Sequence, residues 1–377
     1  MLIKEVRACK IKDSRGDYTI EVSVNKARAS SPSGKSRGKH ETKPYKKSID
    51  WNIKFLNTTK FDLEINSFSD LKKVESFIEK KAKIKDAKQF GADALFALES
   101  AVLKALAKSQ KKQLWQIINP KAKCFPVPLG NAIGGGLHSK KFKVHPTIQE
   151  FLIIPGEKSA AKNVKVMQTV YKHLKKISKS KSVNDEGALQ VPLSDEDILD
   201  ILYMYIGVVR IGLDVAATSF YKKGSYCYKN KCLDRKAQIY YINHLIKKYK
   251  LLYVEDPLEE EDFSGFTKIS KNTMVCGDDL TATHKNRLKK AIRNKSINAM
   301  IIKPNQNGSL VELKEIFEIC RKHKIKTVLS HRSGETMDDA LADYAFGFQA
   351  DFIKTGISTK WRKVKLTRLI KIEKSLR

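Results

Sequence analysis

Short apolar runs that end in a polar or charged residue recur from about residue 126 to the C-terminus. They alternate with stretches whose apolar positions are three and four residues apart, the spacing of a helix with one buried face. This alternation predicts strand and helix units arranged around a parallel sheet. The runs, in order, are TIQEFLIIP, VVRIGLDVAA, LLYVEDPL, MVCGDDLT, AMIIKPNQ, TVLSHRSGE and DFIKTG.

The first 125 residues follow a different pattern. Two strand-like segments, IKEVRACKIKDSRG and DYTIEVSVNKARAS, come before a loop rich in glycine, serine and lysine. A short helix is expected near residues 69–82, and the alanine-rich segment ADALFALESAVLKALAKS predicts a longer one. We therefore expect an α+β domain at 1–125, a linker around CFPVPLGN, where two prolines interrupt the pattern, and a second domain at 126–377.

Polar side chains at the ends of the apolar runs are regularly spaced. The steps between successive ends are 23, 25, 28 and 23 residues, about one strand, one helix and two loops each. In a (β/α)₈ barrel the C-terminal ends of the strands meet at one mouth, which holds the active site. A single lysine at a strand end could extend its ammonium to solvent, but five reactive side chains at this period favour a shared site: Glu255, Asp278, Lys303, His331 and Lys354.

The residue types at these ends predict metal-assisted removal of a proton. Asp214, Glu255 and Asp278 each follow an apolar run, and three carboxylates at one mouth repel one another unless a divalent cation such as Mg²⁺ neutralises them. Taken singly, each could instead cap a helix or form a surface ion pair. Lys303 and Lys354 beside that cation are expected to have a lowered pKa, which would make one of them a base for a proton α to a carboxylate.

The chain is long enough for a sizeable core and is strongly basic. It has 377 residues, 41% of them hydrophobic, and 73 basic against 41 acidic residues give a net charge of +32, a field that attracts polyanions. Residues 158–181 contain eight lysines and no acid, and residues 351–377 contain nine basic residues against two acids. The first stretch also has helical apolar spacing, so a solvated lysine face explains it without nucleic acid, and no zinc finger, aromatic ladder or RNP motif accompanies the charge.

Two further properties bear on the compartment. No apolar run approaches the roughly 20 residues of a membrane span, and the charged N-terminus does not resemble a signal peptide, so a soluble, cytoplasmic protein without membrane insertion is expected. The six cysteines lack the paired spacing of a zinc site, and reduced thiols are expected at Cys9, Cys124, Cys227, Cys232, Cys276 and Cys320.

Eleven short motifs occur in the order found in one known family. They are DSRG, SGKS, PLGNAIGGGLH, QEFLIIP, NDEG, GLDVAA, VEDP, GDDLT, KPNQNGS, SHRSGET and IKTG. On these motifs the chain resembles the enolase family over nearly its whole length, and its PLGN–GGG form is similar to archaeal-type members. The resemblance implies a modified (β/α)₈ TIM-like barrel with a smaller N-terminal α+β capping domain. It also implies reversible dehydration of 2-phosphoglycerate to phosphoenolpyruvate, a step of glycolysis and gluconeogenesis.

The same resemblance implies two Mg²⁺ ions in each site. Asp214, Glu255 and Asp278 would hold the tighter ion. Ser36, in SGKS, would be a ligand of the second ion, which binds together with the substrate. Unusually for the family, Lys35 and Arg37 flank this serine, and their positive charge is expected to weaken the second site.

Catalytic roles follow from the resemblance in the same way. Lys303 would be the base that removes the C2 proton, and Lys354 would stabilise the charge that builds up on the substrate carboxylate. Use of a lysine base with Mg²⁺ is the documented arrangement of the enolase superfamily. Glu186, in NDEG, would be the acid that protonates the departing C3 hydroxyl, and Glu150, in QEF, would support it.

Substrate binding is assigned by resemblance to two further groups. Arg332 and Ser333 would hold the phosphate, and His331 would line the pocket. His138, after three glycines, would come from a mobile loop that closes over the site. Enolases are commonly dimers or larger, so a homodimer or larger homo-oligomer is expected.

Other departures from the family pattern fall outside these side chains. The segment KKFKVHP lengthens the loop after His138, the NDEG loop continues with Ala188 rather than a second glycine, and residues 45–90 are compressed. The run from Ser358 to Arg362 replaces a family arginine-serine-glutamate run and is expected to weaken a subunit contact.

Three alternatives stay open at this level. An enzyme of the same superfamily that acts on another carboxylate would leave Arg332 and Ser333 without an evident purpose. A non-catalytic, polyanion-binding relative would be expected to lack Lys303 or Glu186, and both are present. RNA binding as a second activity through the lysine-rich faces, and a purely compositional origin of the charge, are not separated by the sequence.

Overall fold

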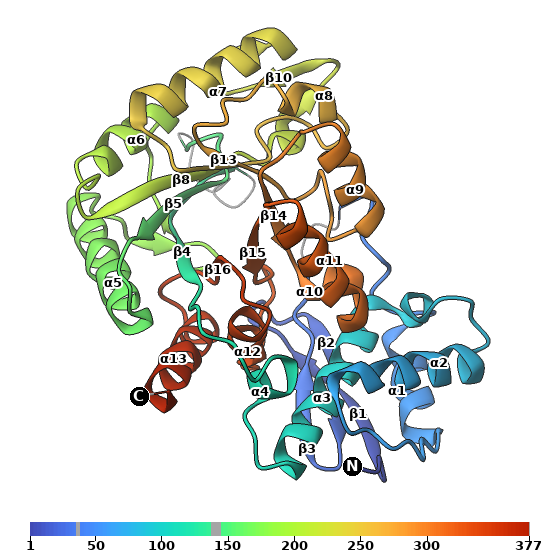
Figure 1. Ribbon diagram of the computed structural model, residues 1–377. Coiled ribbons are helices and arrows are strands. Elements are labelled where there is room, and N and C mark those ends of the chain that lie inside the picture. The colour runs from blue at the N-terminus through green and yellow to red at the C-terminus, as the bar shows by residue number, and fades with distance from the viewer. Residues whose placement is uncertain (35–37, 137–144, 377) are drawn as a thin grey trace.

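The computed structural model describes residues 1–34, 38–136 and 145–376. A small N-terminal domain lies against one side of a β-barrel whose strands are surrounded by helices (Figure 1). The expected architecture, a modified barrel with an α+β capping domain, is confirmed. Within the described part of the chain, no helix has both the length and the apolar character that crossing a membrane requires.

The N-terminal domain begins with a three-stranded antiparallel sheet. Its strands are β1 (Val6–Lys12), β2 (Tyr18–Val24) and β3 (Ala27–Ser30), in the order β1-β2-β3. The sequence predicted one strand where β2 and β3 lie. Asn25 and Lys26, with φ of 46° and 67°, form a two-residue turn between them, and such left-handed turns match the twist of paired strands.

Helices cover this sheet and connect it to the barrel. The longest, α3 (Ala92–Ser109), packs on β2 and β3 and is buried along nearly its whole length, as expected for a helix that is apolar on all sides. The others are α1 (Ile49–Thr58), α2 (Leu71–Ala82), α4 (Leu114–Ile118) and the short 3₁₀ helices Phe68–Asp70 and Ala87–Phe90.

Eight strands close the barrel because the last one, β16, pairs with the first, β4. In order around the barrel they are β4 (Val127–Gly134), β5 (Glu150–Pro155), β8 (Val209–Asp214), β12 (Tyr253–Glu255), β13 (Met274–Gly277), β14 (Ala299–Ile302), β15 (Lys326–Ser330) and β16 (Phe352–Lys354).

Two sequence predictions about the barrel are wrong. The sheet is not fully parallel, because β5 runs antiparallel to both neighbours. Part of the expected linker CFPVPLGN is β4 itself. Pro128 suggested a break, yet it lies before Gly130, the first residue of β4 that pairs with β5, so its missing amide removes no hydrogen bond to β5.

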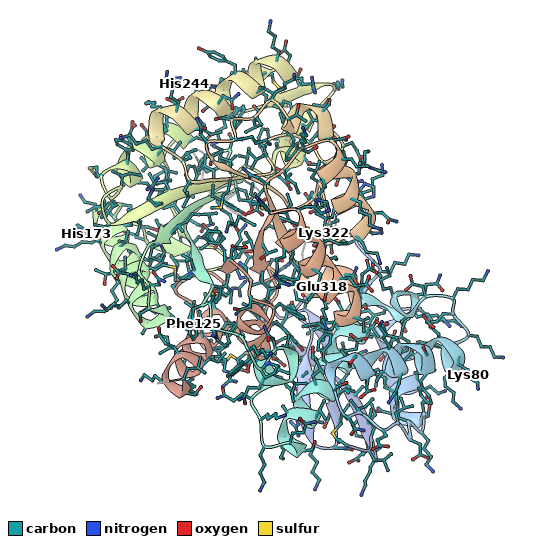
Figure 2. All side chains as sticks on the ribbon, viewed as in Figure 1. Lys80, Phe125, His173, His244, Glu318 and Lys322 are labelled. Atoms are coloured by element: carbon teal, nitrogen blue, oxygen red, sulfur yellow. A yellow bond between two sulfur atoms is a disulfide. The ribbon has the colours of Figure 1, made fainter. Side chains whose placement is uncertain are left out.

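The outer helices carry the solvent-facing side chains. His173 of α5, His244 of α7 and Lys322 of α11 point away from the barrel (Figure 2). The helices are α5 (Ala160–Ile177), α6 (Asp195–Tyr203), α7 (Arg235–Tyr249), α8 (Phe263–Phe266), α9 (Lys285–Arg293), α10 (Pro304–Asn307), α11 (Leu310–Lys322), α12 (Ala340–Gly347), α13 (Lys360–Ser375) and the 3₁₀ helix Ala217–Phe220.

Short strands extend two of the loops. β6 (Ser182–Val183) and β7 (Leu189–Gln190) form a hairpin beside β4, and β9 (Tyr221–Lys222), β10 (Ser225–Cys227) and β11 (Cys232–Leu233) form a small separate sheet. A disulfide joins Cys227 and Cys232 across β10 and β11. The expectation of reduced thiols is therefore wrong for this pair, and Cys9, Cys124, Cys276 and Cys320 are free.

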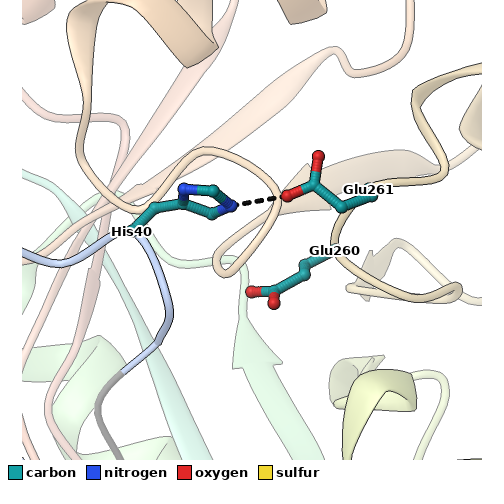
Figure 3. A group of neighbouring side chains, drawn as sticks. All are labelled: His40, Glu260 and Glu261. Atoms are coloured by element: carbon teal, nitrogen blue, oxygen red, sulfur yellow. Dashed lines mark hydrogen bonds and ion pairs between the residues drawn. The ribbon is translucent and has the colours of Figure 1, made fainter.

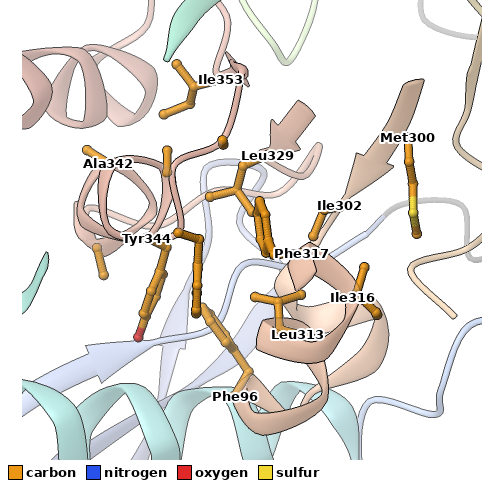
Figure 4. Close-up of a cluster of buried hydrophobic side chains, with 14 of the residues drawn as sticks. Phe96, Met300, Ile302, Leu313, Ile316, Phe317, Leu329, Ala342, Tyr344 and Ile353 are labelled. Carbon is orange, nitrogen blue, oxygen red and sulfur yellow. The ribbon is translucent and has the colours of Figure 1, made fainter. Parts of the chain in front are cut away.

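One apolar core runs through both domains. Phe96 of α3 reaches Tyr344 of α12, with ring centroids 6.0 Å apart, next to side chains of α11 and of the barrel strands (Figure 4). Phe68 likewise contacts Phe348 at 5.8 Å. Because burying aromatic surface on both sides stabilises this contact, the N-terminal domain is held against the barrel and its loops are fixed beside the barrel mouth.

Candidate active site

Alternation along the barrel strands places charged side chains inside the mouth. Ala299 and Ile301 of β14 belong to the small core inside the barrel, whereas Met300 and Ile302 face the outer core. Since successive side chains of a strand point to opposite faces, the next inward position after Ile301 is Lys303. A buried strand therefore delivers an amine to the mouth.

The same alternation places two further side chains in the mouth. Glu255 comes two residues after the inward-facing Tyr253, and Lys354 comes two residues after the inward-facing Phe352. Glu150 differs, because it lies at the start of its strand rather than at the end. The antiparallel direction of β5 brings that start to the mouth, opposite Asp214. In the sequence, the polar residues of QEFLIIP already precede the apolar residues, which is the signal that could have predicted the reversed strand.

Lys354 lies among three buried carboxylates. Its Nζ is 2.9 Å from Asp214 Oδ2, 2.9 Å from Glu255 Oε2 and 2.9 Å from Glu150 Oε2. Burial lowers the pKa of Lys354, but the charges of the three carboxylates outweigh it and raise that pKa well above its usual value. This raised pKa belongs to the mouth without a cation, whereas the expected lowering of the Lys354 pKa supposes a cation beside it, so that expectation stays a prediction.

Lys303 is paired with Asp278, whose Oδ2 accepts a hydrogen bond from its Nζ. Burial lowers the pKa of Lys303, but the Asp278 charge outweighs it and raises that pKa above its usual range. Burial also raises the pKa of Asp278, and Lys303 reverses this and lowers it. The raised pKa belongs to the mouth without a cation, so the expected lowering beside a cation stays a prediction for Lys303 too, and its amine can accept a proton only when this ion pair is relieved.

Glu150 and Glu186 form the acidic side of the mouth together with His331. Burial raises the pKa of Glu150 to about 7, with Lys354 opposing and Glu186 adding to the rise. Glu186 lies in the loop between β6 and β7, and His331 Nε2 is 3.9 Å from its Oε2. Burial and nearby cations, first Arg362, lower the pKa of His331 well below its usual value, so this imidazole is neutral.

Arg332 lies beside these groups, but its guanidinium already has a carboxylate partner. Its Nη2 is 2.9 Å from Glu41 Oε2, and its Nη1 donates to Asn305 Oδ1 at 3.2 Å. Glu41 belongs to the N-terminal domain and was not singled out in the sequence. Arg362, expected only to affect a subunit contact, is buried and donates from Nη2 to the backbone oxygens of Arg332 and Ser333 at 3.0 and 2.9 Å.

The carboxylates of the mouth fit a hard divalent cation. Asp278 Oδ1 is buried with no hydrogen-bond partner among the described residues, as expected for an oxygen reserved for a cation. The Tyr253 hydroxyl donates to Glu255 Oε2 at 2.6 Å and orients that carboxylate. Burial and the Asp214 charge raise the pKa of Glu255 well above its usual value, a cost that a cation removes.

A group of carboxylates other than the predicted one also lies close together at the mouth. Asp256, Asp278 and Asp279 offer oxygens within 4.8 Å of one another. Asp214 and Glu255, two of the three predicted cation ligands, instead form ion pairs with the Lys354 ammonium, which lies between them. Asp256 accepts the backbone amides of Asp278 and Asp279 at 2.9 and 2.7 Å, a positioning contact that the sequence reasoning missed in VEDP.

Most of the predicted residues line one small cavity of about 70 Å³. Its walls include Glu150, Glu186, Asp214, Asp278, Lys303, His331, Arg332, Ser333 and Lys354. The structure thus brings these side chains together, and Glu255 contacts them through Lys354. Ser36, with its neighbours Lys35 and Arg37, lies outside the described residues, as do His138 and most of the KKFKVHP segment.

A second contact joins the two domains beside the mouth. His40 Nε2 lies 2.5 Å from Glu261 Oε1, with Glu260 next to them (Figure 3). Arg287 Nη1 is 3.1 Å from the same Glu261 oxygen. Because Arg287 already offsets the acidic charge, we interpret this group as a contact between the loop at 38–42 and the loop after β12.

The closed barrel, its capping domain and a mouth that gathers carboxylates around two lysines, Lys303 and the buried Lys354, define an enzyme of acid–base chemistry that acts on a small anionic substrate. Comparison with known proteins identifies the family. Residues 3–118 match the model "Enolase, N-terminal domain", and residues 122–377 match "Enolase, C-terminal TIM barrel domain".

Proteins named enolase match the chain over almost its whole length. The enolase of Methanocorpusculum labreanum is 36% identical over 400 residues, covering 98% of both chains. That of Archaeoglobus fulgidus is 37% identical over 401 residues, covering 99% of this chain and 97% of its own. That of Natronomonas pharaonis is 36% identical over 398 residues, covering 99% of both. The chain belongs to the enolase family, and this membership makes it a phosphopyruvate hydratase, a hydro-lyase that forms phosphoenolpyruvate from 2-phosphoglycerate.

Proposed function

We propose that this reaction takes place in the cavity at the barrel mouth, with Lys303 as the base and Glu186 as the acid. The observation that carries the proposal is that both side chains, with Lys354 and Arg332, line the same cavity. A substrate carrying a carboxylate, a C2 hydrogen and a C3 hydroxyl requires a base, an acid and cations at one place.

The first step is proton removal by Lys303. Its amine accepts the C2 proton once Asp278 no longer holds the ammonium form. Negative charge then builds up on the substrate carboxylate, and Lys354 stabilises this charge by facing it with a buried ammonium. The ammonium of Lys354 keeps its proton throughout, consistent with the direction of its pKa shift.

The second step is loss of the C3 hydroxyl. Glu186 donates a proton to the leaving oxygen, which departs as water. Glu150 is positioned to share that proton, because burial brings its pKa to about 7 and allows its acid form near neutral pH. His331, neutral and buried, lines the pocket without adding charge.

We propose that Asp214, Glu255 and Asp278 hold the first Mg²⁺, and that Ser36 is a ligand of the second. When bound, Mg²⁺ supplies charge neutralisation at the carboxylates of the mouth and at the substrate carboxylate. The free Asp278 oxygen and the oxygen-only donor set support this assignment.

The substrate phosphate is assigned to Arg332 and Ser333. A guanidinium matches two phosphate oxygens, and substrate would have to compete with Glu41 for it. His138 is proposed to approach the substrate from its loop. We also propose that the chain works in the cytoplasm as a homo-oligomer, as its family commonly does, and light scattering in solution tests the oligomeric state.

The experiment that tests the proposal compares two lysine variants. Phosphoenolpyruvate formation from 2-phosphoglycerate is followed by ultraviolet absorbance while Mg²⁺ is titrated. Lys303→Ala should lower the rate by at least 10²-fold, the low end for loss of an acid–base group. Lys326→Ala is the control, because Lys326 begins the neighbouring strand at the opposite end of the barrel and is exposed. Full activity of Lys303→Ala would refute the assigned base.

A second candidate function, polyanion binding, is favoured by one surface. All eight lysines of residues 158–181 are exposed on and beside α5. The neighbouring α13 adds exposed Lys360, Lys363, Lys371 and Lys374, while its one acid, Glu373, is buried at the α5 N-terminus and accepts the Ala160 amide at 2.9 Å. Anisotropy of a labelled RNA duplex tests this, because binding to phosphates weakens steeply with salt.

Reversing Lys172, Lys175 and Lys176 to glutamate should remove that binding if the α5–α13 surface carries it. The matched control reverses Lys80, Lys81 and Lys322, which are exposed elsewhere. Equal losses in both triple variants would show that only net charge matters, the compositional explanation.

A further inference from the structure

A cysteine pair outside the active site crosslinks a small hairpin. Cys227 and Cys232 are direct partners across β10 and β11, with a Cα–Cα distance of 4.1 Å and a disulfide between them. Cys232 is exposed and Cys227 is half-buried, so a reductant can reach the bond. Nothing in the dehydration chemistry uses either sulfur.

The crosslinked hairpin supports the loop that follows the metal-side strand β12. Buried Tyr226 lies directly before Cys227, and its hydroxyl oxygen accepts the Glu259 amide at 3.1 Å. Thr218, in the 3₁₀ helix before β9, accepts the Glu260 amide at 3.0 Å. These two contacts hold the backbone at 259–260, four to five residues after Glu255.

Tyr228, directly after Cys227, supports the same loop from the other side. Its hydroxyl donates to Gln238 Oε1 at 3.0 Å, and Gln238 Nε2 donates to the Pro257 oxygen at 3.0 Å. Gln238 and Tyr228 are both buried, so these hydrogen bonds do not compete with water. The hairpin therefore supports the loop at Pro257 and Glu259, next to Glu255 and Asp256.

The hairpin depends on its crosslink. β11 has two residues, lies at the edge of the three-stranded sheet and pairs with β10 at two positions only, so few backbone contacts hold it there. Opening the disulfide therefore frees β11 and the exposed turn at 229–231. Tyr228 is then fixed only by the chain on its β10 side and no longer by the crosslink to β11.

We propose that Cys227–Cys232 is a thiol–disulfide exchange site for dithiols and that its redox state controls how firmly the Glu255–Glu261 loop is held. The consequence for catalysis rests on the proposed role of Glu255 as a cation ligand. Oxidised, the hairpin orders the loop and favours cation binding. Reduced, it lets the loop fluctuate and weakens cation binding.

The exchange reaction balances with a dithiol as the reductant. One thiolate of the dithiol attacks the exposed Cys232 sulfur, the S–S bond breaks, and Cys227 leaves as a thiolate that takes up a proton. The second thiolate then attacks the mixed disulfide and releases Cys232, so two electrons pass to the protein and the dithiol becomes a disulfide.

Three proteins test the proposal: the parent, a Cys227→Ser/Cys232→Ser double variant, and a Cys9→Ser/Cys124→Ser control that removes the two exposed free thiols. Each is treated with oxidised or reduced dithiothreitol and freed of reagent. Thiol titration of the unfolded parent should count four thiols after oxidation and six after reduction, from six cysteines and one disulfide. Six thiols after oxidation would overturn the site.

The second measurement is the Mg²⁺ concentration for half-maximal activity. Reduction should raise it by about threefold to tenfold in the parent and in the control, the low range for loss of support to metal ligands. The serine double variant should resemble the reduced parent in both treatments. An equal Mg²⁺ requirement in both redox states of an active parent would overturn the coupling.

Hydrogen exchange separates this idea from the assignment of the active site. Faster exchange at 225–233 and 256–261 in the reduced protein supports the coupling, even if the enzyme is inactive in both redox states. Inactivity in both states would count against the proposed catalytic residues, not against the coupling. Unchanged exchange at 256–261 would overturn the coupling whatever the activity.

Discussion

Replacement of Lys354 by methionine tests whether this ammonium holds the mouth together. The side chain is 5% exposed and contacts three carboxylates, each at 2.9 Å. Methionine fills nearly the same space without charge, so the packing is kept and the compensation of the three negative charges is lost.

The size of the effect follows from the burial. Removing one partner of a buried ion pair costs roughly 3–5 kcal/mol, because the charges left behind have no counterpart. At about 2 °C per kcal/mol for a chain longer than 150 residues, the melting temperature should fall by about 6–10 °C. Lys354 lowers the pKa of Glu150 and of Glu255, so without it these carboxyls take up protons more easily, and the loss should shrink from pH 7 to pH 5.

The assay is thermal unfolding of the metal-free protein, followed by fluorescence at both pH values. Lys326→Met is the matched control. Its ammonium is 2.7 Å from Asp351 Oδ1, but its side chain is 55% exposed, so the expected cost is about 1 kcal/mol or less. If Lys354→Met melts within about 2 °C of Lys326→Met, the reasoning that the buried carboxylates depend on this ammonium is refuted.

Three further outcomes are expected. Glu186→Gln should lower the rate of phosphoenolpyruvate formation by about 10²–10⁴-fold with an unchanged melting temperature, and a rate within a factor of two of the parent would contradict its role as the acid. Burial raises the pKa of Asp195 to about 6, so the folded state keeps a proton that the unfolded chain releases from about pH 4 upward. The contribution of Asp195 to the free energy of unfolding should therefore fall between pH 4 and pH 6. Asp195→Asn, compared with the parent by melting at several pH values, should gain up to about 3 kcal/mol of stability over it above that window. Gly91→Ala should lower the free energy of unfolding by about 1–3 kcal/mol, because Gly91 has φ +107° and a Cβ would lie 2.4 Å from Tyr45 Cα. Gly207→Ala is the control: a Cβ there has no heavy atom within 4 Å, so this variant should have the melting temperature of the parent.

Much of the fold could be predicted from periodicity. The segment ADALFALESAVLKALAKS is helix α3 with the expected bounds, and each of the seven apolar runs contains a barrel strand. The reversed direction of β5 was missed, because the apolar positions of a run look alike in both directions and only the polar Gln149 and Glu150 at its start indicated the reversal. Pro128 concealed β4 for a related reason, since only the pairing around it shows whether an amide is needed there.

The sequence by itself determined which side chains at the strand ends reach the mouth, because alternation along a strand and one charged residue at its end are local properties. Only the tertiary structure decided how those charges interact. Without a cation at the mouth, the pKa of Lys303 and of Lys354 is raised, because Asp278 lies beside the first ammonium and three carboxylates surround the second. Electrostatic interaction depends on separation and burial, and residues 140 positions apart, such as Asp214 and Lys354, acquire both only when the barrel closes.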